Sequence, residues 1–108
     1  MDSGGHLMWQ IVSFDLPVDD AAMRKEYRLF RKRLLQEGFM AMQKSLYFRW
    51  FDTLEKARAF QRILMKSSPP KGYVVIFGLS EKNFEDALKL EDGNITDMPP
   101  VPEAWTIF

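Results

Sequence analysis

The chain has 108 residues, of which 46% are hydrophobic and 28% charged, and its formal net charge is zero. That length suits one domain with one hydrophobic core. No apolar run approaches the roughly 20 residues that a membrane-spanning helix needs, and residues 1–7 lack the layout of a signal peptide. The absence of cysteine excludes disulfides, Cys-ligated zinc and thiol catalysis, and it agrees with a cytoplasmic location.

The neutral charge is an average over two unlike parts of the chain. Residues 1–72 carry an excess of five positive charges, and residues 73–108 carry an equal excess of negative charges. Basic residues are densest in 24–33, "RKEYRLFRKR", where six Lys or Arg stand beside one acid. Such a patch can bind nucleic-acid phosphates whatever the overall charge, and a solvated helix face is the alternative interpretation.

The first part of the chain predicts a tail, a strand and a helix. Residues 1–7 are expected to be a flexible tail or a remnant ahead of a natural start at Met8. Residues 8–14 are aromatic and β-branched, which predicts a mostly buried strand that Pro17 ends. Asp19 or Asp20 then fits the N-cap of a helix. The inward stripe of this helix is Met23, Tyr27, Phe30 and Leu34, and Gly38 is expected to end it.

The middle of the chain predicts extended structure and a second helix. Residues 39–51, "FMAMQKSLYFRWF", read either as one bent strand or as two short strands with a break near Lys44 and Ser45. Thr53 is a good N-cap for a helix that runs to about Met65. Its inward residues are expected to be Ala57, Phe60 and Leu64.

The last third predicts one long strand and an arm. "YVVIFGL", residues 73–79, is expected to be a central strand because its apolar character is unbroken. A turn at 80–83 and a further strand at 87–90 follow. Residues 91–104 contain three prolines and predict an irregular arm, which ends in "WTIF".

This order of elements predicts an α+β fold of ferredoxin-like type over residues 8–90, with an antiparallel sheet and two helices on one face. Residues 91–108 would add a C-terminal arm and an edge strand. Two helices cover only one face of such a sheet, and the chain has more aromatic residues than one hydrophobic core needs. Because large exposed apolar patches usually mark an interface, we expect a homodimer.

An ordered set of short motifs resembles CRISPR-associated protein 2, in the longer form found beside type II systems. The motifs are "FDLPV" after the first strand, Arg24-Lys25, Phe30-Arg31, "LL" at 34–35, "EGF" at 37–39, and then Gln43, Ser45, Tyr47 and Arg49. "PPKGYVVIFGLSEKNFE" and the aliphatic-Phe end are similar to the last strand and arm of that form. The resemblance runs from about Met8 to Phe108.

The resemblance implies a homodimer in which the acid after the first strand, here Asp15, faces the dimer cleft from each subunit. The two carboxylates would form a Mg²⁺ site, and the implied activity is metal-dependent endonuclease cleavage of RNA or DNA. The resemblance also implies an architectural role, in which the dimer bridges two dimers of CRISPR-associated protein 1, the integrase, and holds double-stranded spacer DNA during spacer acquisition.

Asp15 is therefore the candidate catalytic and metal-ligating residue. Magnesium keeps several waters and needs only one or two carboxylates plus phosphate oxygens, so two copies of Asp15 across a two-fold axis would suffice. A turn acid that merely accepts backbone N–H bonds is the alternative. The sequence shows no general-base pattern, since His6 is the only histidine and lies in the predicted tail.

Two further groups of residues complete the predicted sites. The candidate nucleic-acid contacts are Arg24, Arg28, Arg31 and Lys32 on the first helix, with Lys44 and Arg49 on the extended segment that follows. Phosphate contacts of this kind position a duplex without reading its sequence. The candidate dimer or partner interface is the end of the arm, where Trp105, Ile107 and Phe108 would add a strand to a sheet edge.

Three functions compete. The first is the CRISPR adaptation scaffold with accompanying nuclease chemistry. The second is a stand-alone metal-dependent endoribonuclease or toxin-like nuclease. The third is a non-enzymatic RNA-binding module, which needs a run such as "KGFGFV". The corresponding stretch "EGFMAMQKSLYF" lacks the second glycine and the preceding basic residue.

Overall fold

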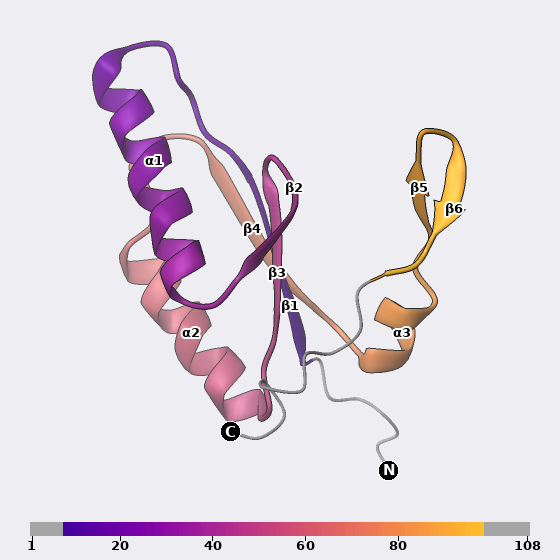
Figure 1. Cartoon of the computed structure of the whole chain (residues 1–108). Coiled ribbons are helices and arrows are strands. Elements are labelled where there is room, and N and C mark those ends of the chain that lie inside the picture. Colours follow the sequence, from indigo (N-terminus) through magenta and orange to yellow (C-terminus); the bar gives the residue numbers. More distant parts are fainter. Residues whose placement is uncertain (1–7, 99–108) are drawn as a thin grey trace.

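The structure of this chain is a computed structural model that describes residues 8–98 (Figure 1). Its elements follow in the order β1 (Trp9–Asp15), α1 (Ala21–Gln36), β2 (Met40–Gln43), β3 (Leu46–Trp50), α2 (Leu54–Lys66), β4 (Tyr73–Leu79), α3 (Glu81–Glu85), β5 (Lys89–Glu91) and β6 (Asn94–Thr96). No helix within this range is both long and apolar enough to cross a membrane.

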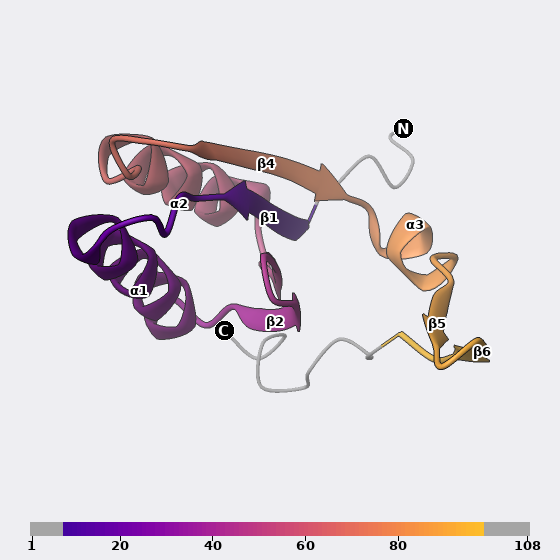
Figure 2. The ribbon, with the colours of Figure 1, turned by 90° about the horizontal axis from the view of Figure 1, so that it is seen from above.

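The first four strands form one antiparallel sheet in the order β2-β3-β1-β4, and β5 and β6 form a separate hairpin. Strand, helix, two strands, helix and strand in this spatial order make a ferredoxin-like α+β fold, which confirms the predicted fold class. Figure 2 shows three layers: α1 and α2 cover one face of the sheet, and α3 with the hairpin lies beyond the other face.

The ends of the two long helices are set by local side chains. The Asp20 carboxylate accepts a hydrogen bond from the Met23 amide at 2.8 Å, so Asp20 is the N-cap of α1. The Thr53 hydroxyl accepts from the Lys56 amide at 3.1 Å and caps α2 in the same way. Gly38 follows the C-cap of α1 with a φ of +88°. All three sequence predictions are confirmed, because caps depend on neighbours in the chain.

β1 contributes to both hydrophobic cores because its side chains alternate between the two faces of the sheet. Val12 and Phe14 point toward the helices and join the core that α1 and α2 cover. This core also contains the predicted inward residues Phe30, Leu34, Ala57, Phe60 and Leu64, together with Leu16, Phe39, Tyr47 and Phe51. The helix layer is therefore held by a core that the periodicity of the two helices predicts.

The second core lies on the opposite face of the sheet and is closed by α3. It contains Trp9, Ile11 and Phe48 from the sheet and Phe84 from α3. The rings of Trp9 and Phe84 are stacked, with centroids 3.9 Å apart and planes 11° apart. α3 thus covers only the end of the sheet where β1 begins, and it leaves the other end of this face open.

The structure corrects one sequence prediction about the strands and decides between the two alternatives of another. The apolar strand 73–79 is β4, which lies at an edge of the sheet and not at its centre. Its unbroken apolar character has another cause, because one of its faces packs on the helices and the other is an exposed apolar surface. The segment 39–51 contains two strands with a turn at Lys44 and Ser45, so the second of the two predicted alternatives is correct.

The arm is also more regular than its composition predicts. Residues 94–96 form β6, which pairs with β5 around a turn at Asp92 and Gly93, both with positive φ. Residues 81–85 form the short helix α3 where the sequence predicted a turn. Strands and helices of three to five residues carry too little periodicity to be recognised from sequence.

Candidate metal and nucleic-acid site

Asp15 is the last residue of β1 and points to the sheet face opposite the helices. The alternation along β1 fixes this direction, since Trp9 and Ile11 belong to the outer core while Val12 and Phe14 belong to the helix-covered core. Asp15 is exposed, and within residues 8–98 no hydrogen bond or ion pair engages its carboxylate. The carboxylate is therefore available to a ligand, and nothing described supports the turn-acid alternative.

An apolar surface lies beside Asp15 on β4. Tyr73, Val75 and Phe77 face the same side of the sheet as Asp15 and are 76%, 55% and 43% exposed. We call these three residues the β4 outer face. β1 pairs with β4 so that Asp15 lies opposite Tyr73 and Ser13 lies opposite Val75. Neither the layer of α1 and α2 nor α3 covers this end of the face (Figure 2).

The loop before β4 passes close to the end of β1 at Gly72. Its φ is +92°, and a Cβ atom added there would lie 2.5 Å from the Asp15 carbonyl oxygen and 3.0 Å from the Leu16 Cα. Only glycine tolerates such an approach, because the obstructing atoms are backbone and cannot rotate away. Gly72 thus allows the loop before β4 to pass close to the Asp15 backbone, and sequence reasoning missed this role because the contact is between distant segments.

The donor set near Asp15 fits magnesium only in part. Within the described part of the chain no group of three or more His, Cys, Asp or Glu residues could hold a metal ion. A single exposed carboxylate is a weak site for a hard cation. A second Asp15 from another copy of the chain would provide the pair of oxygen ligands that a hydrated Mg²⁺ needs, so the residues fit Mg²⁺ across a two-fold interface.

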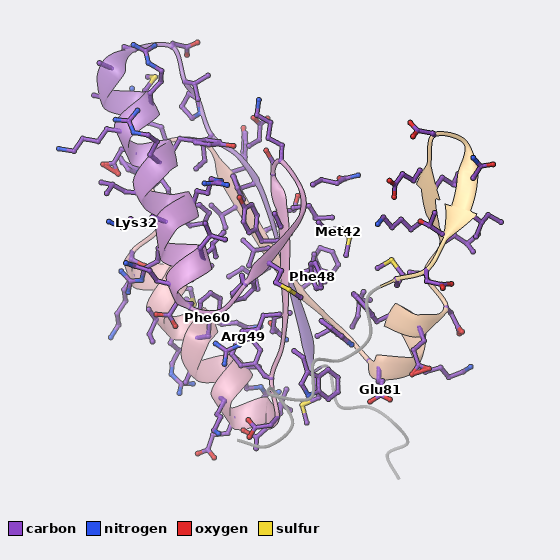
Figure 3. The ribbon with its side chains drawn as sticks, viewed as in Figure 1. Lys32, Met42, Phe48, Arg49, Phe60 and Glu81 are labelled. Carbon is purple, nitrogen blue, oxygen red and sulfur yellow. The ribbon has the colours of Figure 1, made fainter. Side chains whose placement is uncertain are left out.

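The predicted nucleic-acid contacts on α1 lie on the helix layer, away from the Asp15 face. Arg24, Arg28, Arg31 and Lys32 are all exposed, and none forms an ion pair with another residue between 8 and 98. In Figure 3, Lys32 lies on the outer side of α1, away from the sheet. Lys44 is exposed at the turn between β2 and β3, and its carbonyl accepts a hydrogen bond from the Tyr27 hydroxyl.

Arg49 is held differently from the other predicted basic contacts. It is half-buried, its guanidinium donates to the main-chain carbonyl of Glu37 at the end of α1, and it lies 4.3 Å over the Phe51 ring. Burial lowers the pKa of Arg49, and the carboxylates of Glu37 and Asp52 oppose this shift. Its guanidinium therefore stabilises the fold at the C-terminus of α1, which leaves it less available to phosphate than the α1 cations.

Charge is divided between the two sides of the sheet. The helix layer carries the α1 cations and also Arg58, Arg62 and Lys66 of α2, which sequence reasoning did not single out. The layer of α3 and the hairpin carries most of the acidic excess, at Glu81, Glu85, Asp86, Glu91 and Asp92. A polyanion is thus attracted to the helix layer and repelled from the other side. The predicted interface residues Trp105, Ile107 and Phe108 lie outside the described residues.

The fold and the site define a class of protein: a ferredoxin-like domain with an acid at the end of its first strand and, beside it, a sheet face that the described residues cover only in part. The family described as CRISPR associated protein Cas2 matches residues 8–87 of the chain. This chain belongs to the Cas2 family of CRISPR-associated proteins, as the resemblance in its motifs predicted.

Individual relatives agree with this assignment. The CRISPR-associated endoribonuclease Cas2 of Paracidovorax avenae is 32% identical over 108 residues, which is 100% of both chains. The protein of the same name from Ligilactobacillus salivarius is 40% identical over 76 residues, 70% of this chain and 75% of the relative. That of Streptococcus mutans is 39% identical over 77 residues, 71% of each chain.

Replacing Gly72 by alanine should destabilise the fold by more than about 2 kcal/mol, because positive φ costs a non-glycine residue roughly 1–2 kcal/mol and the new Cβ also meets backbone. Gly93→Ala is the matched control, since Gly93 has a φ of +83° but no atom within 4 Å of its added Cβ. Urea unfolding of both variants measures the difference. Equal losses would show that the contact with Asp15 has no energetic consequence.

Proposed function

We propose that this protein is a CRISPR adaptation subunit: a homodimer that binds spacer DNA on its helix layers, bridges integrase dimers, and carries a Mg²⁺-dependent endonuclease site built from the two Asp15 carboxylates. The observation that carries the proposal is the position of Asp15. A carboxylate that no residue between 8 and 98 engages stands at the end of the central strand, on the sheet face that α3 covers only in part.

The β4 outer face supports the homodimer. Three adjacent exposed apolar residues on a sheet face, beside a partly exposed apolar core, form a patch that water solvates poorly. A two-fold interface is self-complementary, so one copy of this face can cover the other. A two-fold axis that passes near the end of β1 would also bring the two Asp15 residues toward each other, because they lie on that face. One interface would therefore form both the dimer and the metal site.

The nuclease chemistry would come from the metal, with the chain providing its ligands. Bound Mg²⁺ polarises a phosphodiester and lowers the pKa of a coordinated water. Asp15 of each subunit would hold the ion, and the Gly72 contact would keep each carboxylate in place. The relatives are named endoribonucleases, which supports RNA cleavage as the activity to test first.

The α1 cations support the binding of nucleic acid through its backbone. Four exposed Arg and Lys side chains at helical spacing, free of ion pairs within residues 8–98, can each approach a phosphate. They project from the opposite side of the sheet to Asp15, so a duplex on α1 is not held at the carboxylate. Binding and cleavage are therefore expected to be separable functions of one molecule.

The experiment that tests the proposed function compares two assays on the same purified protein. A pull-down with the CRISPR integrase, with and without duplex DNA, tests the scaffold role. Cleavage of RNA and DNA in Mg²⁺ and in EDTA tests the nuclease role. Integrase capture with cleavage at the EDTA level would support the scaffold alone, and cleavage without capture would support the stand-alone endoribonuclease.

Val75→Asp should convert the dimer to a monomer at micromolar concentration. The new carboxylate would be buried without a partner between two apolar faces, which costs several kcal/mol. Light scattering measures the oligomeric state, and circular dichroism checks that the fold survives. Met65→Asp is the control, because Met65 is 75% exposed on the helix layer. A dimer that persists in Val75→Asp would show that the β4 outer face is not the interface.

Asp15→Ala should reduce Mg²⁺-dependent cleavage to the level of the EDTA control while the fold and duplex binding persist. Asp15 is exposed and makes no described side-chain contact, so its loss should change the stability by no more than about 0.5 kcal/mol. Asp19→Ala is the control, since Asp19 is exposed and is not the N-cap of α1. Cleavage that survives in purified Asp15→Ala would place the activity elsewhere.

Charge reversal of Arg28 and Arg31 together should weaken duplex binding to a similar extent for unrelated sequences, because phosphate contacts carry no sequence information. The slope of log K against log salt should become shallower by up to about two units, roughly 0.9 per lost contact. The matched control is Arg58→Glu with Arg62→Glu on α2, which changes the net charge equally. Equal losses in both double variants would show that binding follows net charge and not the α1 surface.

A further inference from the structure

Tyr73 is the cross-strand neighbour of Asp15. The antiparallel register between β1 and β4 places the two residues directly opposite each other at the end of the pair. Residues opposite each other in an antiparallel pair have Cβ atoms about 4.5–5.5 Å apart, and their side chains project from the same face. Tyr73 is thus the β4 residue whose side chain starts nearest to that of Asp15.

The Tyr73 side chain has no structural partner in the described protein. It is 76% exposed, which is the largest exposure on the β4 outer face. No hydrogen bond engages its hydroxyl and no other ring packs against it within residues 8–98. The other two tyrosines differ, because Tyr27 donates to the Lys44 carbonyl and Tyr47 is buried in the helix-covered core. The dimer proposed above would cover the ring as part of the β4 outer face, but no contact within residues 8–98 accounts for the hydroxyl at position 73.

Gly72 makes the position of Tyr73 relative to Asp15 well defined. The start of β4 lies against the end of β1, since a Cβ added at Gly72 would meet the Asp15 carbonyl and the Leu16 Cα. Tyr73 is the next residue, so its backbone cannot shift along the strand without disturbing this contact. Tyr73 stands at the end of the β4 outer face and is 76% exposed in a single copy, so its hydroxyl is suited to contact a ligand at the margin of the proposed interface.

The lengths of the two side chains decide what Tyr73 can touch. Side chains stand roughly perpendicular to a sheet, and a tyrosine extends further from it than an aspartate does. The phenol oxygen therefore reaches past the carboxylate, to the region where a group bound by an ion on Asp15 would lie. A phenol O–H is a hydrogen-bond donor that phosphate oxygens accept, and it carries no charge that would compete for the ion.

We propose that Tyr73 is a nucleic-acid-binding residue of the Asp15 site, whose hydroxyl donates a hydrogen bond to an oxygen of the phosphodiester held there. This inference rests on the proposed function, since it requires a metal-bound phosphate at Asp15. It adds a residue on β4 to which the motif resemblance assigns no role, and it assigns the phenol to the phosphate and not to the ion.

The experiment compares Tyr73→Phe, which removes only the hydroxyl, with Tyr27→Phe, which makes the same change on the helix side of the sheet. Binding of a labelled oligoribonucleotide is measured by fluorescence polarisation in Mg²⁺ and in EDTA, with the integrity of the probe checked on a gel. Binding of Mn²⁺ alone is measured by electron paramagnetic resonance. Asp15→Asn is measured beside both variants, and light scattering reports the oligomeric state of each.

Tyr73→Phe should weaken oligoribonucleotide binding about tenfold in Mg²⁺, the effect of losing one hydrogen bond to a charged group. It should leave binding in EDTA, Mn²⁺ affinity and dimerisation within about twofold of the unaltered protein. Tyr27→Phe should change none of these. Asp15→Asn should abolish Mn²⁺ binding and the Mg²⁺-dependent part of oligoribonucleotide binding.

Other outcomes overturn the inference, and they separate it from the proposed function. If Tyr73→Phe binds normally while Asp15→Asn loses Mn²⁺, the metal site stands and the role of Tyr73 is refuted. Equal weakening in Mg²⁺ and EDTA, or a monomeric Tyr73→Phe, would assign the tyrosine to another surface or to the dimer interface. If Asp15→Asn still binds Mn²⁺, the proposed metal site fails, and the inference fails with it.

Discussion

The structure depends on one requirement: the central strand β1 must contribute side chains to two hydrophobic cores at once. β1 pairs with β3 from Trp9 to Ser13 and with β4 along its whole length, and its alternate residues enter the helix-covered core and the core closed by α3. A shift of one residue in either register would exchange the two sets of side chains. It would also turn Asp15 toward the helix-covered core, where an unpaired carboxylate is costly. The packing of Trp9, Ile11, Val12 and Phe14 therefore determines which face of the sheet carries the candidate site.

The features that sequence reasoning predicted are those that depend on nearby residues. Asp20, Thr53 and Gly38 were recognisable because a cap needs only its own helix turn, and the inward stripe of α2 needs only helical spacing. The order of strands is not local, so an apolar run read as a central strand proved to be the edge strand β4.

The candidate site was predictable to the same limited extent. The motif resemblance marked Asp15, and its orientation followed only once the register of β1 was known. Gly72 and Tyr73 come within reach of Asp15 through an antiparallel pairing that spans about half the chain, and no periodicity encodes that pairing. Arg49 has the charge of a phosphate contact, but its surroundings place the guanidinium against the end of α1. The charge of Arg49 is visible in the sequence, whereas its contact with the end of α1 depends on the fold.

The unequal charge of the two parts of the chain becomes a difference between the two sides of the sheet. The basic excess lies on α1 and α2, and the acidic excess lies on α3 and the hairpin, with the sheet between them (Figure 2). In the proposed dimer the two uncovered sheet faces meet, so each basic helix layer lies on the outside. Nucleic acid would then bind on the two outer surfaces, while the paired Asp15 residues stand in the middle. A duplex bound by α1 need not touch the metal, and loss of metal binding need not weaken duplex binding. Because the basic helices and Asp15 lie on opposite faces of one sheet, a protein of this architecture can act as a scaffold whether or not it cleaves nucleic acid.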